Sequence, residues 1–322
     1  MLSRVADALF WMSRYIERSE HVARMLDVSF NLELDLSAVV PGSYDLHWMG
    51  LLNAMQQPAS VVERYPDSSR RDALMQWFTF DGNNPHSISS CVTRSRANAR
   101  GVRGSIPNEV WKELNKLYWQ LRDEDFKKRA TESPSEYYGA VEEGSHAVQG
   151  MCDALMAHDE GWQFIQLGKF LERFFITVRF VDVHNELLRE LTDPADLPLA
   201  NLHWAGVLRC CAGYHAYQRM HVGRVEPGRV LDLLLLNPGV PRSARFCLEA
   251  ALKSLADMYG EGLSRRRTES KCERLLGKAL SDLRYADLNA LAATTDGLHI
   301  FLTDLLDRCT EASLALQEMY SV

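Results

Sequence analysis

The fold is decided by residues 2–26, which read LSRVADALFWMSRYIERSEHVARML. Apolar side chains recur in this stretch at steps of three and four residues, which places them on one face of an α-helix. They are Leu2, Val5, Ala6, Leu9, Met12, Ile16, Ala23 and Leu26. The sequence therefore predicts a long first helix whose apolar stripe packs on a core.

Helical patterns follow along most of the chain, and no alternating pattern typical of a β-strand stands out. Only 19 glycines and 11 prolines occur in 322 residues, which is few for a protein of many short strands. The sequence predicts an all-α multi-helix bundle. Asn84 is expected to cap a helix that Pro85 opens, and Pro241 is expected to open another. The expected helices span residues 45–57, 70–80, 85–104, 107–127, 134–157, 160–191, 199–222, 226–236, 241–259, 269–281 and 285–319.

The chain also resembles itself at a separation of 155 or 156 residues. Three blocks match in the same order: residues 15–18 with 170–173, residues 46–52 with 202–208, and Pro85, Ser87 and Cys91 with Pro241, Ser243 and Cys247. Such ordered self-similarity is typical of internal repeats. We therefore expect two tandem copies of one helical unit, residues 1–155 and 156–322, packed as one body with an approximate internal two-fold.

Composition and charge exclude several classes of protein. The 36 Lys and Arg against 43 Asp and Glu give a net charge of −7, which argues against nucleic acid or anionic lipid as a partner. Charged residues interrupt the apolar positions of the N-terminal stretch, and no later stretch is long and apolar enough to span a membrane. The seven cysteines form no CxxC motif, which indicates reduced thiols, no structural zinc and a cytoplasmic location.

Two Glu-Arg dipeptides, at 17–18 and 172–173, lie among apolar residues of expected helices. Neighbours on a helix point about 100° apart, so each pair must find partners elsewhere. An exchanged pairing, Glu17 with Arg173 and Glu172 with Arg18, would satisfy both. The structural interpretation is an ion-pair network that holds helices together, and the alternative is a ligand site. The candidate residues are Arg14, Glu17, Arg18, Glu20, Arg24, Glu172 and Arg173.

A second cationic cluster follows in residues 82–108, which contain no Asp or Glu. Arg96, Arg100 and Arg103 are spaced by four and three residues, so we expect them on one helix face near Arg94. Arginine recognises carboxylate and phosphate groups with two parallel hydrogen bonds. This face is the best candidate for an anion site, and Arg242 is a weaker analogue in the second copy.

His47 and His203 occupy matching positions, each beside a tryptophan. Together with Glu17 and Glu172 they raise the idea of a metal site in a helical bundle. The Glu-x-x-His spacing of carboxylate-bridged metal bundles is absent, so packed His-Trp pairs are preferred and no metal is expected. The chain contains no nucleophile elbow, phosphate-binding glycine loop or HExxH motif, so no cofactor is expected either.

These motifs resemble the bacterial alpha-E domain family, named for a helical domain with a Glu-Arg signature. The resemblance rests on residues 1–6, 11–20 and 23–24, and further on 84–88, 98–103, 110–115, 171–173, 237–238 and 241–243. It implies a cytoplasmic all-helical protein whose gene accompanies, or is fused to, that of a circularly permuted ATP-grasp protein. A transglutaminase-like or amidase-like protein often accompanies them. One departure is Phe174-Phe175, where relatives tend to have a small residue and an acid.

Three functions remain open from the sequence. The leading hypothesis is a non-catalytic helical partner of an ATP-grasp amide or peptide ligase, with a site for a carboxylate or phosphate group at the Glu-Arg and Arg-rich faces. The alternative is an amide-forming transferase or amide hydrolase that uses Glu17 as general base, with Arg18, Arg100 or Arg103 holding an anionic substrate. The third is a pure scaffold, which predicts that acids from neighbouring helices cover Arg96, Arg100 and Arg103.

Overall fold

The computed structural model describes residues 2–37, 45–189, 197–260 and 270–320. Helices make up its regular structure, and no strand occurs in these four ranges, so the all-α prediction is confirmed. The α-helices are α1 (Ser3–Ser37), α2 (Asp45–Ala54), α3 (Arg70–Thr79), α4 (Ile88–Gly101), α5 (Asn108–Gln120), α6 (Glu124–Glu132), α7 (Pro134–Leu155), α8 (Glu160–Arg189), α9 (Leu197–Cys210), α10 (Tyr214–Met220), α11 (Pro227–Leu231), α12 (Ala244–Gly260), α13 (Lys271–Arg284), α14 (Leu288–Ala292) and α15 (Gly297–Tyr320). Shorter turns are the 3₁₀ segments η1 (Ala59–Arg64) and η2 (Arg103–Ser105) and the π segment η4 (Asp232–Leu236).

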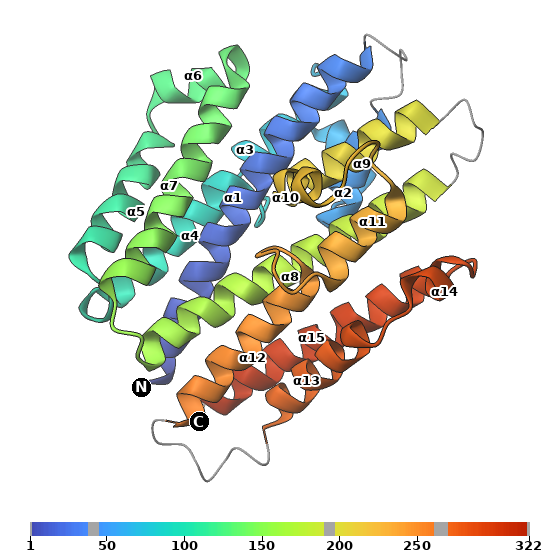
Figure 1. Cartoon of the computed structure of the whole chain (residues 1–322). Helices are drawn as coiled ribbons and strands as arrows, with labels where there is room; N and C mark the ends of the chain where they lie inside the picture. The colour runs from blue at the N-terminus through green and yellow to red at the C-terminus, as the bar shows by residue number, and fades with distance from the viewer. Residues whose placement is uncertain (1, 38–44, 190–196, 261–269, 321–322) are drawn as a thin grey trace.

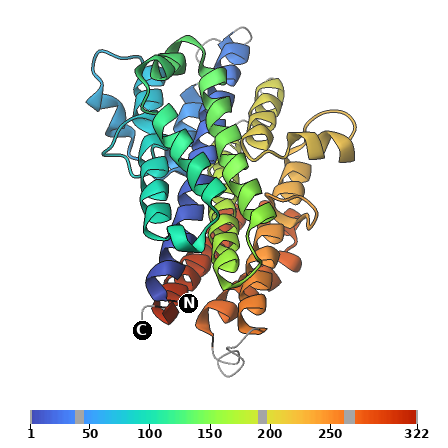
Figure 2. The same cartoon turned by 90° about the vertical axis from the view of Figure 1, so that its left-hand side faces the viewer.

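The two long helices α1 and α8 pack against each other at the centre of the molecule (Figure 1). Helices α4 and α7 pack on α1, whereas α12 and α15 pack on α8. Helix α5 joins α4 and α7 on one side, and α13 joins α12 and α15 on the other, as both views show (Figures 1 and 2). Helix α2 packs on α8 and α9 packs on α1, so each central helix receives a short helix from the other half of the chain.

The crossing of α1 and α8 is unusually close. A Cβ atom at Gly168 of α8 would lie 2.4 Å from the backbone oxygen of Phe10 in α1, so only glycine fits there. Nearby, the Ser13 hydroxyl donates a hydrogen bond of 2.7 Å to the Ile165 carbonyl oxygen across the same contact. Helix α8 buries 20 of its 30 residues, which is the pattern of a helix surrounded on all sides. The charged residues that α1 and α8 carry at this contact are therefore held in the core.

Serines, not prolines, begin the two helices expected at Pro85 and Pro241. Ser87 accepts a hydrogen bond from the backbone N–H of Ser90 and caps α4, and Ser243 accepts one from Phe246 N–H and caps α12. The expected starts were wrong by about one turn, because a serine three residues before a free N–H is a stronger cap. Asn84 uses its side chain within the preceding loop, where it accepts from His86 N–H.

Three expected helices are broken in two. Asp123 caps α6 and so divides residues 107–127, and residues 293–296 separate α14 from α15. Helix α9 ends at a left-handed residue, Ala212 with φ of 49°, which divides residues 199–222. The N–H groups of Ala212 and Gly213 then bond to the carbonyl oxygens of Arg209 and Leu208, as in a Schellman motif. The sequence hides this stop because the left-handed residue is not a glycine.

Cysteines and helix length agree with the sequence-based expectations. All seven cysteines are buried and unlinked to one another. No helix in the described ranges combines the length and the apolar character needed to cross a bilayer.

Candidate functional site

Glu172 of α8 lies between two arginines of α1. Its Oε2 is 2.7 Å from Nε of Arg14, and its Oε1 is 2.6 Å from Nε of Arg18. Arg18 adds a second hydrogen bond of 2.9 Å from Nη2. The carboxylate is buried, and these guanidinium groups hold its pKa far below the usual range against the opposing effect of burial. Glu172 is therefore an ionised group whose charge is balanced by α1.

Glu17 of α1 has the mirror arrangement. Its Oε1 lies 2.7 Å from Nε of Arg173 on α8 and 2.9 Å from Nη1 of Arg242, which precedes α12. Gln149 of α7 donates a 2.8 Å hydrogen bond to Oε2 and accepts one of 3.0 Å from Arg173. The exchanged pairing between the two Glu-Arg dipeptides is confirmed. It ties α1 and α8 together twice and recruits α7 and the start of α12.

Glu20 extends this cluster toward α7. Its Oε2 lies 2.7 Å from Nη2 of Arg242, and its Oε1 accepts from Arg24 and lies 3.3 Å from Nε2 of His146. Arg24 also pairs with Glu142 of α7 at 2.8 Å. Every oxygen of Glu17, Glu20 and Glu172 thus has a partner. We name this set the Glu-Arg network: Arg14, Glu17, Arg18, Glu20, Arg24, Glu142, His146, Gln149, Glu172, Arg173 and Arg242.

The network leaves Glu17 poorly suited to act as a general base. Its side chain is fully buried at 0% exposure, so a substrate has no route to it in this structure. Arg173 and Arg242 also outweigh the cost of burial and lower its pKa below the usual range, which weakens it as a proton acceptor at neutral pH. The geometry is that of a structural carboxylate, in line with the interpretation of an ion-pair network.

Two groups in or beside the network have pKa values far from their ordinary ones. Burial raises the pKa of Glu142 to about 7, and the nearby Glu20 carboxylate adds to this shift although Arg24 opposes it. His21 is fully buried, and burial together with Arg242 lowers its pKa to about 3. Its Nδ1 lies 3.2 Å from Nη1 of Arg242, so the neutral ring accepts this hydrogen bond. Glu142 is the network carboxyl group whose charge changes near neutral pH.

Arg24 of α1 and Arg179 of α8 differ in whether an acid pairs with them. Arg24 has Glu20 one helical turn before it, but Arg179 has Phe175 in that place and rests on its ring at 5.4 Å. Nε of Arg179 is buried with no hydrogen-bond partner among the described residues, and burial lowers the pKa of its guanidinium. Phe175 thus stands to Arg179 as Glu20 stands to Arg24, and no carboxylate of the described residues pairs with Arg179. Sequence reasoning did not select Arg179 as a site residue.

The arginines of α4 lie apart from the network, against α5. The guanidinium carbon of Arg96 lies 4.3 Å from the ring centre of Tyr118 and 5.4 Å from that of Trp111, and Nε donates to Asn115 at 2.8 Å. Arg103 lies 4.9 Å from the Trp111 ring. We name this surface the Arg-aromatic face and define it by Arg96, Arg100, Arg103, Trp111, Tyr118 and Trp119.

The expectation for these three arginines was partly wrong. Arg103 follows the end of α4 and belongs to η2, so it shares no helix face with Arg96 and Arg100. A tertiary contact still brings Arg96 and Arg103 to one ring. Arg100 and Arg103 are exposed, and no carboxylate of the described residues lies within ion-pair distance of Arg96, Arg100 or Arg103. Aromatic rings, not acids, cover part of this face.

Of the two repeated histidines, His203 is the one whose side chain lies within the described residues. His203 is buried on α9, and burial lowers its pKa to about 4, so it is neutral at pH 7. Burial, and to a lesser extent the nearby His203, lower the pKa of His184 on α8. The side chain of His47 lies outside the described residues, although its backbone belongs to α2.

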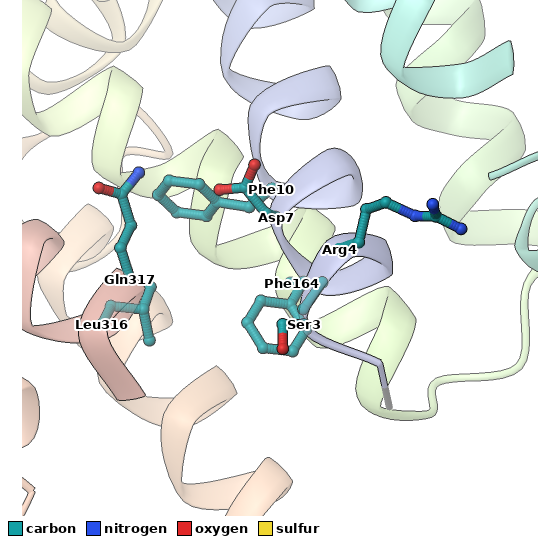
Figure 3. Close-up of a pocket in the computed structure, with 8 residues that line it drawn as sticks. Ser3, Arg4, Asp7, Phe10, Phe164, Leu316 and Gln317 are labelled. Atoms are coloured by element: carbon teal, nitrogen blue, oxygen red, sulfur yellow. The ribbon is translucent and has the colours of Figure 1, made fainter. Parts of the chain in front are cut away.

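A pocket of about 320 Å³ lies where the start of α1 meets the end of α15 (Figure 3). Phe10, Phe164 and Leu316 supply its apolar lining, and Asp7 and Gln317 supply polar groups. The Arg4 side chain points away from Gln317 in this view (Figure 3). None of the site residues expected from the sequence lines this pocket, so it is separate from the Glu-Arg network.

Residues 1–320 match the model of the Alpha-E family, which is described as a predicted alpha-helical domain with a conserved ER motif. The chain belongs to the Alpha-E family. The two buried Glu-Arg dipeptides give this motif a physical meaning in the Alpha-E chain, because each supplies the counter-ions of the other.

The Alpha-E chain is also similar to uncharacterised mycobacterial proteins. Relatives from Mycobacterium bovis and from two strains of Mycobacterium tuberculosis are each 25% identical to it over 336 residues. The match covers 97% of the Alpha-E chain but 37% of each relative, so the chain spans just over a third of their length. No solved structure shows a significant match.

The sequence missed the contribution of α7. Glu142, His146 and Gln149 are spaced by four and three residues and share one helix face, which was a detectable signal. Arg14, Glu17, Arg18, Glu20, Arg24, Glu172, Arg173 and Arg242 were all named from the sequence, and the structure brings them together. Arg96, Arg100 and Arg103 form a different surface.

Proposed function

We propose that this Alpha-E chain is a non-catalytic helical partner of an ATP-grasp-type amide or peptide ligase. The observation that carries the proposal is that the candidate arginines named from the sequence fall into two sets. The arginines that pair with Glu17, Glu20 and Glu172 are committed to buried carboxylates, whereas the Arg-aromatic face has none. The second set is the one left to meet carboxylate or phosphate groups of another molecule.

The chemistry of the Arg-aromatic face suits docking. Stacking on Trp111 and Tyr118 orders the Arg96 guanidinium without neutralising its charge. Trp119 is 57% exposed beside it and offers an apolar anchor. Arginine, tryptophan and tyrosine are the residue types that carry most binding energy at protein interfaces. An acidic surface of the partner would complement this face.

The relatives support a function in partnership. In the mycobacterial proteins the matched region is joined to sequence that makes up most of their length, so the Alpha-E region works there within a larger protein. That the partner is an ATP-grasp protein, accompanied by a transglutaminase-like or amidase-like protein in the cytoplasm, follows from the family resemblance. The buried, unlinked cysteines are consistent with that compartment.

We further infer that the bundle consists of two copies of one unit, residues 1–155 and 156–322. The exchanged Glu-Arg pairs support this, as do matching local structures at the same separation. Helices α2 and α9 end in the same Schellman motif with a non-glycine left-handed residue, Gln56 in one and Ala212 in the other. Ser87 and Ser243 cap α4 and α12, and Cys91 and Cys247 donate to the carbonyl oxygens of Pro85 and Pro241.

The two alternative functions lose support. Glu17 is enclosed and paired, so a hydrolase or transferase that uses it as a base would need the core to open. A pure scaffold predicts acids over Arg96, Arg100 and Arg103, and the described residues place aromatic rings there instead.

A matched pair of charge-reversal variants tests the docking proposal. In one, R100E/R103E, two exposed arginines of the Arg-aromatic face become acidic. The control, R274E/K278E, makes the same charge change on α13, on the opposite side of the molecule (Figures 1 and 2). Calorimetric titration with the ATP-grasp protein of the same organism should show binding weakened roughly tenfold or more by R100E/R103E and little changed by the control. The proposal fails if the two proteins never bind, or if the ligase reaches its full rate without this chain.

A further inference from the structure

A groove of about 610 Å³ lies between the first half of α8 and helix α12, from Phe246 to Met258. Its size falls within the usual range of small-molecule sites. It shares no residue with the Glu-Arg network, the Arg-aromatic face or the pocket of Figure 3. The groove is therefore an independent feature of the fold.

The groove contains polar groups that have no partner within the protein. The Gln163 side chain is 5% exposed, yet its Oε1 has no hydrogen-bond partner among the described residues. The indole Nε1 of Trp162, the preceding residue, is also buried and unpartnered. By contrast, the neighbouring Gln166 donates a 2.7 Å hydrogen bond to Asp153. Buried polar groups are nearly always paired in folded proteins, so two adjacent exceptions that line one groove indicate a missing partner.

Aromatic rings form the apolar part of the same groove. The rings of His158 and Trp162 are stacked, with centres 3.8 Å apart and an interplanar angle of 14°. The rings of Phe170 and Phe246 lie 5.9 Å apart and join α8 to α12. These surfaces accept an apolar or aromatic side group.

The rim carries charges of both signs on α12. Lys253 and Asp257 are exposed, line the groove, and have no ion pair within the described part of the chain. Glu160 at the start of α8 adds a second carboxylate to the lining. Charged groups of both signs are complementary to a ligand that itself carries both charges. A phosphate or another simple anion would meet the Asp257 carboxylate and is disfavoured.

We propose that this groove binds a small zwitterionic molecule that contains an amide group and an apolar side group, as a dipeptide does. The unpartnered Oε1 of Gln163 can accept a hydrogen bond from the N–H of the ligand amide. The Trp162 indole can donate to an oxygen of the ligand. Lys253 and Asp257 then face the carboxylate and ammonium ends, and the four aromatic rings surround the side group. This proposal does not depend on docking of a ligase.

Nuclear magnetic resonance of the ¹⁵N-labelled full chain tests the proposal. The Trp162 indole signal is identified by its loss in W162F, and the probes are Ala-Xaa dipeptides that cover every side chain. We expect an aromatic or apolar Ala-Xaa peptide to shift the Trp162 indole and Gln163 carboxamide signals saturably. Free phenylalanine, which lacks the peptide bond, should bind at least about tenfold more weakly.

A matched pair of glutamine variants separates binding from folding. Q163L should weaken the dipeptide roughly tenfold or more, and Q218L, the same change at an exposed site of α10, should not. Q163L should melt no lower than the native chain, because it removes an unpaired buried amide. Inorganic phosphate should leave the Trp162 signal in place. Equal dipeptide affinity in Q163L and the native chain, or no saturable shift with any dipeptide, overturns the proposal.

Discussion

Oε1 of Glu17 lies 2.7 Å from Nε of Arg173, a residue 156 positions further along the chain. The reciprocal contact joins Glu172 to Arg18 at 2.6 Å. Each central helix therefore supplies both the anion and the cation that its neighbour needs. Because the carboxylates are buried, removal of one partner leaves an uncompensated charge in the core, which is far more costly than loss of a surface ion pair.

Arg24 and Arg179 should respond differently to removal of their charge. Methionine keeps much of the apolar stem, so R24M chiefly leaves Glu142 without its arginine and Glu20 with Arg242 as its remaining arginine, and we expect a loss of about 1–3 kcal/mol of unfolding free energy. R179M breaks no ion pair among the described residues and should change the unfolding free energy by less than about 0.5 kcal/mol. Urea unfolding of both variants measures the difference. Equal losses would contradict this prediction and show that the charge of Arg179 is paired in the folded chain.

Glu142 should make stability fall as the pH rises toward neutrality. Its pKa is raised to about 7 in the folded chain from an ordinary value of 4.5, so the folded state binds its proton more tightly. Its contribution is complete below pH 4.5 and is lost as the pH rises to about 7, by at most about 3 kcal/mol. E142Q should remove this trend, which urea unfolding between pH 5 and pH 8 would reveal. Parallel pH profiles for both proteins would contradict it.

Alanine should have opposite effects at Gly168, which lies in the close crossing of α1 and α8, and at Gly277, which lies outside it. G168A places a methyl group 2.4 Å from the Phe10 carbonyl oxygen and should destabilise the chain by about 1–3 kcal/mol. G277A adds the same methyl group in α13, where nothing lies within 4 Å, and should stabilise the chain by up to about 1 kcal/mol. Thermal unfolding of the two variants should shift in opposite directions. A neutral G168A would mean that the helices are further apart than described.

The Glu-Arg network was partly predictable because charged residues among apolar ones need counter-ions. Charged pairs among apolar residues of two helices must find partners, and this alone predicted Glu17 with Arg173 and Glu172 with Arg18. Arg242 reaches Glu20 across 222 residues, and no helical period carries that information. The stacking of Arg96 on Tyr118 likewise depends on how α4 packs on α5. The contacts of Arg242 and Arg96 therefore depend on long-range packing, which sequence patterns do not reveal.

Helix boundaries show a similar division. The apolar periodicity located α1, α7 and α8 closely, because long stripes average over single residues. The break after α9 escaped notice because Ala212 adopts the left-handed conformation usually reserved for glycine. The starts of α4 and α12 were misplaced because the serine caps compete with nearby prolines that look equally suitable.

The central claim is that the Glu-Arg pairs hold the helices together and do not act on a substrate. The most direct measurement is the free energy of unfolding of E17Q, with E63Q, an exposed glutamate of η1, as control. We predict a loss of about 3–5 kcal/mol for E17Q, because Arg173 and Arg242 lose their shared anion, and a change below about 0.5 kcal/mol for E63Q. An E17Q chain that unfolds at the same denaturant concentration as the native chain would contradict the structural role of the Glu-Arg pairs and make Glu17 a candidate base again.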